Sequence, residues 1–149
     1  SSTPTTHYLK GTNYGFSIPA GATIDGIVVE IERKETGNHT PTFPHDSAVR
    51  IVKSDGSIGT TNKGDLLTAY PSTDTYASYG SSSDLWGETW AYTDINDADF
   101  GAVLSVVDAI PSETTGGTQV DHIRITVYYT EGGVVTTITH FLSLLGVGT

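Results

Sequence analysis

Cysteine and methionine are both absent from this 149-residue chain, and basic residues are scarce. Without cysteine there are no disulfides, no thiol chemistry and no thiolate zinc sites, and the redox compartment cannot be inferred. The 17 acidic residues outnumber the 7 basic ones and leave a net charge of −10, which repels nucleic-acid phosphates and anionic membranes. The longest apolar run is far shorter than the roughly 20 residues of a membrane helix. We therefore expect neither nucleic acid nor a membrane as a partner.

The chain starts at Ser1 rather than at a methionine, and residues 1–6 contain no recognisable signal peptide. We expect that an N-terminal piece was removed by processing or is omitted from the sequence, and that the protein is exported or packaged. A chain of this length fits one domain with a substantial hydrophobic core. Neither disulfides nor a metal ion is then needed to hold the fold together.

The residues that are abundant favour β-structure. The chain has 17 Gly and 8 Tyr, many Ser, Thr and β-branched residues, and little helical periodicity. Apolar and polar residues alternate over 27–34 and again over 120–129, as in half-buried strands, and Asp55-Gly56 marks a hairpin. About seven or eight strands with short connections predict an antiparallel β-sandwich of jelly-roll or immunoglobulin-like type. One short helical turn is expected near 93–98, with Thr93 as its N-cap.

An apolar segment follows the last predicted strand of the sandwich. Residues 1–131 form the predicted sandwich domain, and residues 132–149 contain eight apolar side chains after the pair Gly132-Gly133: Val134, Val135, Ile138, Phe141, Leu142, Leu144, Leu145 and Val147. The β-branched start predicts a strand through about Thr139, followed by an apolar plug. The segment either folds onto its own domain or docks on a neighbouring subunit. We favour docking, with the glycine pair as the hinge of an assembly arm.

Few residues have the spacing of a catalytic or metal site. The acidic cluster Asp94, Asp97 and Asp99 has the oxygen donors that calcium prefers but departs from the EF-hand pattern, so we favour charge complementation of the helical turn. Glu30 and Glu32 share one face of a strand, where alternating charges are typical of a solvent-exposed surface. His122 is expected to form a cross-strand hydrogen bond. We predict no enzymatic activity and no cofactor, with calcium as the alternative.

Aromatic residues gather in one loop-rich stretch. Aromatic rings in loops can stack on sugar rings, so a carbohydrate-binding face is an alternative function, and its candidate residues are Tyr76, Tyr79, Trp86, Trp90 and Tyr92. We favour the simpler interpretation that these rings close the ends of the sandwich.

Five segments together resemble a known family. They are "YLKGTNYGFSIPAGATIDGIVVEIERK", "VRIVKSDGSIGTTNKGD", "YGSSSDLWGETW", "DINDADFGAVLSV" and "VDHIRITVYYTEGG". Their order and spacing resemble small β-sandwich proteins of tailed phages, prophages and environmental viral genomes, which are virion or appendage components. Relatives usually carry a further strand before the position of Tyr8. Its absence would leave an open sheet edge near Tyr8 and Leu9, and an open edge invites a strand from another subunit.

The sequence thus predicts a non-enzymatic structural subunit in a virion or an extracellular setting. We expect it to self-assemble, alone or with other virion proteins, into a capsid, tail or fibre through strand or arm exchange, with the apolar residues of 134–147 together with Tyr8 and Leu9 as the subunit interface. A module that binds cell-surface glycan and a pilus-like cellular fibre subunit are the alternatives.

Overall fold

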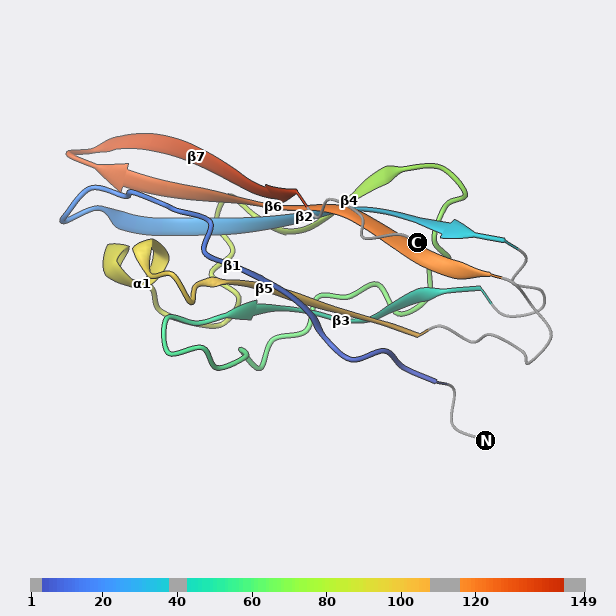
Figure 1. Cartoon of the computed structure of the whole chain (residues 1–149). Helices are drawn as coiled ribbons and strands as arrows, with labels where there is room; N and C mark the ends of the chain where they lie inside the picture. Colours follow the sequence, from blue (N-terminus) through green and yellow to red (C-terminus); the bar gives the residue numbers. More distant parts are fainter. Residues whose placement is uncertain (1–3, 38–42, 108–115, 144–149) are drawn as a thin grey trace.

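The computed structural model describes residues 4–37, 43–107 and 116–143. These residues form two antiparallel β-sheets that pack face to face, with one short helix at one end (Figure 1). The strands are β1 (Leu9–Thr12), β2 (Thr23–Thr36), β3 (His45–Val52), β4 (Thr75–Ser81), β5 (Gly101–Val107), β6 (Gly117–Glu131) and β7 (Val134–Ser143), and the helix is α1 (Tyr92–Asn96). The predicted all-β sandwich is confirmed. Its jelly-roll or immunoglobulin-like type stays a prediction.

The smaller sheet has the strand order β1-β5-β3 and the larger sheet the order β4-β2-β6-β7. The sheets are aligned so that β7 and β1 lie on one side of the sandwich: a Cβ added at Gly11 would lie 3.2 Å from Leu142. On the other side, Asp46 of β3 accepts a hydrogen bond from Tyr79 of β4. The strands β7 and β1 therefore form one edge of the sandwich, and β4 and β3 form the other.

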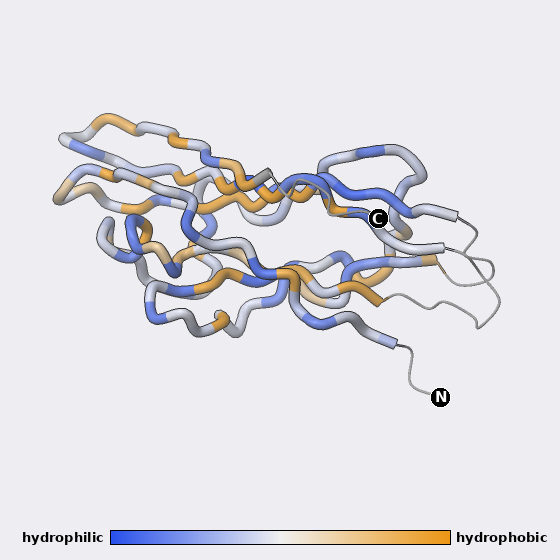
Figure 2. Tube along the Cα trace, viewed as in Figure 1, coloured by the Kyte–Doolittle hydropathy of each residue, from blue (hydrophilic) through white to orange (hydrophobic). Residues whose placement is uncertain are grey.

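The core lies between the sheets because each strand alternates its side chains between the two faces. On β2, Ile27, Val29 and Ile31 are fully buried, as the alternation predicts. Figure 2 shows apolar colouring along strands of both layers, continuing into β7. Burial of each side chain of this size contributes about 1.5 to 3 kcal/mol to the stability of the folded state. The burial of these alternate residues holds the two sheets together.

The short helix begins two residues earlier than predicted. Its N-cap is Ala91 rather than Thr93. The Asp94 carboxylate accepts a hydrogen bond from the Ala91 N–H at 2.9 Å, which is the bond from the third helical residue back to the N-cap in a capping box. The alanine side chain accepts no hydrogen bond in return, as the predicted threonine cap would have done. Among the described residues no helix is both long and apolar enough to cross a bilayer.

Candidate functional site

Residues 134–143 of the C-terminal apolar segment form the edge strand of the larger sheet. Gly132 and Gly133 join β6 to β7 with φ angles of 56° and 85°, which suit a two-residue hairpin turn. Strand β7 then pairs with β6 from Glu131↔Val134 to His122↔Ser143 without a shift of register. The glycine pair is therefore a turn rather than the predicted hinge. Residues 134–143, predicted as an arm separate from domain 1–131, belong to the sandwich, and the strand extends beyond Thr139.

The apolar residues of β7 divide between its two faces. Ile138 and Leu142 pack against the core, whereas Val135 and Phe141 lie on the outer face and are 68% and 70% exposed. Val134, next to the turn, is also exposed. The other predicted interface residues of this segment, Leu144, Leu145 and Val147, lie outside the described residues. The part of the segment that the structure describes thus stabilises its own domain and still presents apolar surface.

The edge of β7 lacks the features that usually protect an edge strand. Lysine or other charges, proline, a bulge or a very short length are the common means of preventing edge-to-edge pairing. The ten residues VVTTITHFLS contain no Asp, Glu, Lys, Arg or Pro, and their register with β6 is continuous. Strand β7 is thus a long, regular and uncharged edge.

The hairpin also determines which backbone groups of β7 point outward. The residue pair that flanks a two-residue turn is hydrogen-bonded, and bonded and non-bonded pairs then alternate along an antiparallel ladder. Val134, Thr136 and the even-numbered residues after them therefore bond to β6. Val135, Thr137, Thr139 and Phe141 direct their N–H and C=O groups away from it. Within the part of the chain that the structure describes, β6 is the neighbour of β7 in the sheet, and no loop bonds to these outward groups.

The smaller sheet is better protected at both edges. Strand β1 has only four residues and includes Lys10; of the predicted interface residues there, Tyr8 is 45% exposed and Leu9 packs against the core. The edge of β3 is covered by the segment 59–63, where Gly59 N–H donates to Ile51 O at 2.8 Å and Lys63 N–H donates to Val49 O at 2.9 Å. The edge expected near Tyr8 exists, but it is short.

At the far edge of the larger sheet, β4 is also uncharged but less regular. It has seven residues, and Gly80 near its end has a φ of 89°, which is not extended. Its exposed ring, Tyr76, stacks on Arg124, whose guanidinium carbon is 4.1 Å from the ring centroid. Strand β7 is the longer of the two edges and the one that exposes more apolar surface.

The aromatic residues proposed to bind glycan are mostly part of the core. Trp86 is 1% exposed, Tyr79 6% and Trp90 9%. Trp86 Nε1 donates to Ile27 O at 2.9 Å, so this side chain is fully engaged inside the sandwich. Tyr92 is half-buried against the core, and Tyr76 is exposed. The alternative of a glycan-binding face therefore gains no support from three of its five rings, which are buried as the favoured structural interpretation expects.

The three aspartates considered for calcium act in local hydrogen bonds. Asp94 caps the helix and accepts a hydrogen bond from the Ser54 hydroxyl at 2.8 Å. Asp97 accepts a hydrogen bond from the Asp99 N–H at 2.8 Å, which closes the turn after α1. Within the described ranges no three His, Asp or Glu side chains converge on a common point. The calcium alternative gains no support from this arrangement.

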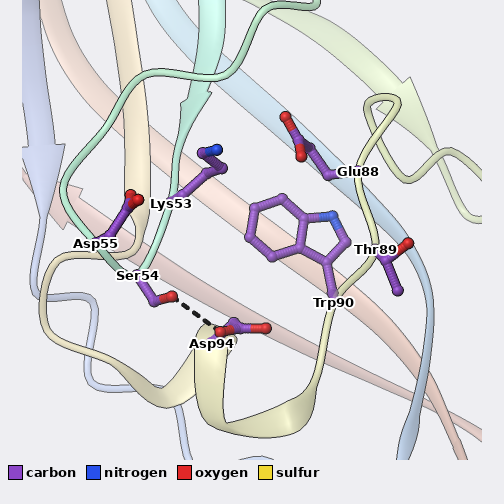
Figure 3. A pocket seen from close by; sticks show the side chains of 7 residues that line it. All are labelled: Lys53, Ser54, Asp55, Glu88, Thr89, Trp90 and Asp94. Carbon is purple, nitrogen blue, oxygen red and sulfur yellow. Dashed lines mark hydrogen bonds between the residues drawn. The ribbon is translucent and has the colours of Figure 1, made fainter.

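A shallow pocket of about 270 Å³ lies between the turn after β3 and the start of α1 (Figure 3). It is lined by Lys53, Ser54, Asp55, Glu88, Thr89, Trp90 and Asp94. Hydrogen bonds from Ser57 lower the pKa of Asp55, and Asp94 already accepts two bonds from its own chain. The Trp90 Nε1–H donates to Leu85 O rather than into the pocket. Most of its polar groups thus serve the fold.

Charged pairs cover the outer face of the larger sheet. Arg124 donates two hydrogen bonds to Glu30, at 2.6 and 2.8 Å, and this contact lowers the pKa of Glu30. His122 Nδ1 lies 2.5 Å from Glu32, which confirms the predicted cross-strand bond. Each of the two glutamates is thus paired with a cation or imidazole on β6. These pairs fit the interpretation of this face as a solvent-exposed one.

The least expected group is a buried ion pair that joins the two sheets opposite to β7. Arg33 of β2 and Asp46 of β3 are 5% and 0% exposed, and Arg33 donates to both Asp46 and the Tyr79 hydroxyl. The hydroxyls of Tyr70 and Tyr79 donate to Asp46 at 2.8 and 2.6 Å, and the Asp65 N–H donates at 2.9 Å. Each oxygen of the carboxylate thus has partners, as a buried charge requires.

Sequence reasoning had a signal for one half of this pair. The alternation that buries Ile27, Val29 and Ile31 continues to Arg33, and extending it by one step would have placed this arginine on the inner face. In the structure both oxygens of the Asp46 carboxylate are engaged by this cluster. No local pattern connects Arg33 with its partner.

Burial makes three tyrosines hard to ionise. Desolvation raises the pKa of Tyr14, and desolvation together with the nearby Asp46 charge raises the pKa of Tyr70 and Tyr79. A raised pKa in the folded state means that the unfolded chain loses these protons first. The associated stability is fully present below about pH 10, the ordinary tyrosine pKa, and is lost as pH rises above it.

We predict that these three of the 8 tyrosines stay protonated in the folded protein at about pH 11 and ionise only on unfolding. Tyrosinate absorbance as a function of pH, with and without denaturant, measures this. A Tyr79→Phe variant should have two tyrosines that ionise only on unfolding instead of three. Simultaneous titration of all tyrosines near pH 10 while circular dichroism still reports the native fold would contradict the prediction.

Comparisons with protein-family models, with curated proteins and with solved structures found no match to the chain.

Proposed function

We propose that the protein is a non-enzymatic structural subunit that self-assembles by strand addition between neighbouring chains. The observation that carries the proposal is the β7 edge, which is long, uncharged and regular and exposes Val135 and Phe141. An added strand would satisfy the outward backbone groups and cover apolar surface in one step. The resemblance to virion and appendage proteins supplies the setting: a capsid, tail or fibre, or an extracellular filament.

Hydrogen bonding, side-chain contacts and charge all favour strand addition at this edge. Each backbone hydrogen bond to a new strand contributes about 0.5 to 1.5 kcal/mol net, and each well-placed cross-strand pair of side chains adds about 0.2 to 1 kcal/mol. The net charge of −10 keeps separate copies soluble. An edge without charge is where copies approach with least repulsion. Other virion proteins are further partners in this proposal. In the alternative setting of a pilus-like cellular fibre, the subunits would join through the same β7 edge.

A lysine on the β7 edge is expected to prevent assembly. Thr137 is exposed and directs its backbone groups outward, so Thr137→Lys adds a charge that a second strand would have to desolvate. Light scattering and electron microscopy should show assemblies for the unchanged chain and monomers for the variant. Because the substitution also reduces the net negative charge, general repulsion alone would predict the opposite result.

The matched control is Thr89→Lys, which makes the same chemical change at an exposed loop residue that belongs to no strand. It should assemble as the unchanged chain does, and both variants should melt at the same temperature as that chain. Assembly of Thr137→Lys equal to that of Thr89→Lys would show that β7 is not the contact. An unchanged chain that stays monomeric at all concentrations would overturn the proposed function itself.

A further inference from the structure

We infer that the strand added to β7 is β7 of a second copy, running antiparallel about a two-fold axis at Ile138. The inference rests on the proposed function and specifies its partner and geometry. It joins the larger sheets of the two copies into one continuous sheet. Such an interface is isologous, because the same residues of both copies meet.

The alternation of β7 limits the registers that an added strand can adopt. The outward backbone groups belong to the odd-numbered residues 135–141, so in a hydrogen-bonded antiparallel pair an odd-numbered residue of one copy must face an odd-numbered residue of the other. The axis then passes through a residue and not between two residues. The midpoint of Val134–Ser143 lies between Ile138 and Thr139. These two residues are the candidates for the axis.

Only the axis at Ile138 pairs the exposed apolar residues. In this register each copy's Val135 faces the other copy's Phe141, and Thr137 faces Thr139. Val135 and Phe141 are 68% and 70% exposed in the single chain, and an aromatic residue opposite a β-branched one is a favourable cross-strand pair, as are two facing threonines. An axis at Thr139 would instead place Phe141 opposite Thr137 and Val135 opposite Ser143.

The inner face of the joined strands is compatible with the same register. The two Ile138 side chains would meet across the axis in a non-hydrogen-bonded pair, where side chains come closest. Ile138 already packs partly buried against the core, so the contact extends each core toward the other. Thr136 would face His140. No residue is left opposite a like charge.

Charge also favours a second copy at this place. The strand has no Asp, Glu, Lys or Arg, and the nearest acidic residue in the hairpin, Glu131, pairs with Val134 beside the turn. In the antiparallel arrangement the two Glu131 residues lie at opposite ends of the joined strands. The repulsion between two copies of net charge −10 is therefore weakest along β7.

The chain has no cysteine, so introduced thiols report the register directly. We would prepare full-length Thr137→Cys and Thr139→Cys variants with different affinity tags, oxidise each alone and in a mixture, and count disulfide-linked dimers. The Cα atoms of facing residues in a hydrogen-bonded pair are about 5.5 Å apart, within the range that a disulfide spans. Residue 137 and its own symmetry mate are about 7 to 8 Å apart, which is too far.

In the mixture, we expect disulfide-linked dimers that carry both affinity tags. Either variant oxidised alone should give only background linkage. Linkage of Thr139→Cys alone would place the axis at Thr139 and overturn the inference. If light scattering shows assembly but none of the three oxidised samples contains linked dimers, another edge, such as β4, receives β7. The inference would then fail while the proposed function stands. Absence of both assembly and linkage would overturn both. Circular dichroism of the reduced variants verifies folding.

Discussion

Replacing Asp46 with alanine is expected to lower the free energy of unfolding by about 3 to 5 kcal/mol, the usual effect of breaking a buried ion pair by removing one partner. The Asp46 side chain is completely buried and that of Arg33 nearly so. Burial opposes the Arg33 charge, but Tyr79 and Asp46 more than compensate, so that the pKa of Arg33 is raised. Without the carboxylate, a buried guanidinium and the hydroxyls of Tyr70 and Tyr79 lose their acceptor. Urea unfolding followed by fluorescence measures the change.

The matched control is Asp74→Ala. Asp74 also pairs with a cation, Lys34 at 2.9 Å, but its side chain is 43% exposed. Water replaces the lost partner there, and we expect little change. A double variant, Arg33→Met with Asp46→Leu, should lose less stability than Asp46→Ala because it leaves no orphaned charge. Equal losses for Asp46→Ala and Asp74→Ala would show that the buried cluster does not support the fold.

Replacing Trp86 with alanine is expected to have the second large effect and to lower the free energy of unfolding by about 3 to 5 kcal/mol. Trp86 is 1% exposed, and its ring lies below Lys63, whose ammonium is 5.3 Å from the ring. Truncation would leave a cavity the size of an indole and remove the hydrogen bond to Ile27 O. Gly80 belongs to the same packing: a Cβ there would lie 2.9 Å from Trp86 Nε1. Thermal and urea unfolding measure the loss.

Tyr76→Ala is the comparison within the same group of rings. Tyr76 is exposed and touches Arg124 on the outer face, so its loss should change stability by no more than about 1 kcal/mol. The pair of variants also separates two interpretations of the aromatic stretch. Full stability of Trp86→Ala would mean that the ring is not structural, and the carbohydrate-binding alternative would regain its basis.

The buried cluster and the β7 edge lie on opposite sides of the sandwich. Arg33, Asp46 and Tyr79 connect β2, β3 and β4, whereas β7 lies beyond β6 at the other edge of the larger sheet. The cluster therefore ties the two sheets together where no neighbour is proposed to bind. It leaves the opposite edge available for strand addition, on a sandwich held closed at its far side.

The sequence by itself determined the fold class, because the alternation of apolar and polar residues is a local property that backbone geometry turns directly into two faces. It also located the segment with the apolar edge, since a run such as VVTTITHFL is visible without any partner. The inward position of Arg33 could have been inferred in the same way, by extending the alternation of strand β2 by one step. Each of these inferences needs only the spacing of residues along one strand.

Only the tertiary structure decided what those residues contact. Whether Gly132-Gly133 is a hinge or a turn depends on β7 finding β6, and whether Trp86 faces solvent or the core depends on the packing of two sheets. Asp46 meets Arg33, Tyr70 and Tyr79 because β2, β3 and β4 come together in space. Such contacts join residues far apart in the chain, and no local spacing encodes them. Residues 134–143, predicted as part of a free arm, are for this reason an edge strand of the sandwich.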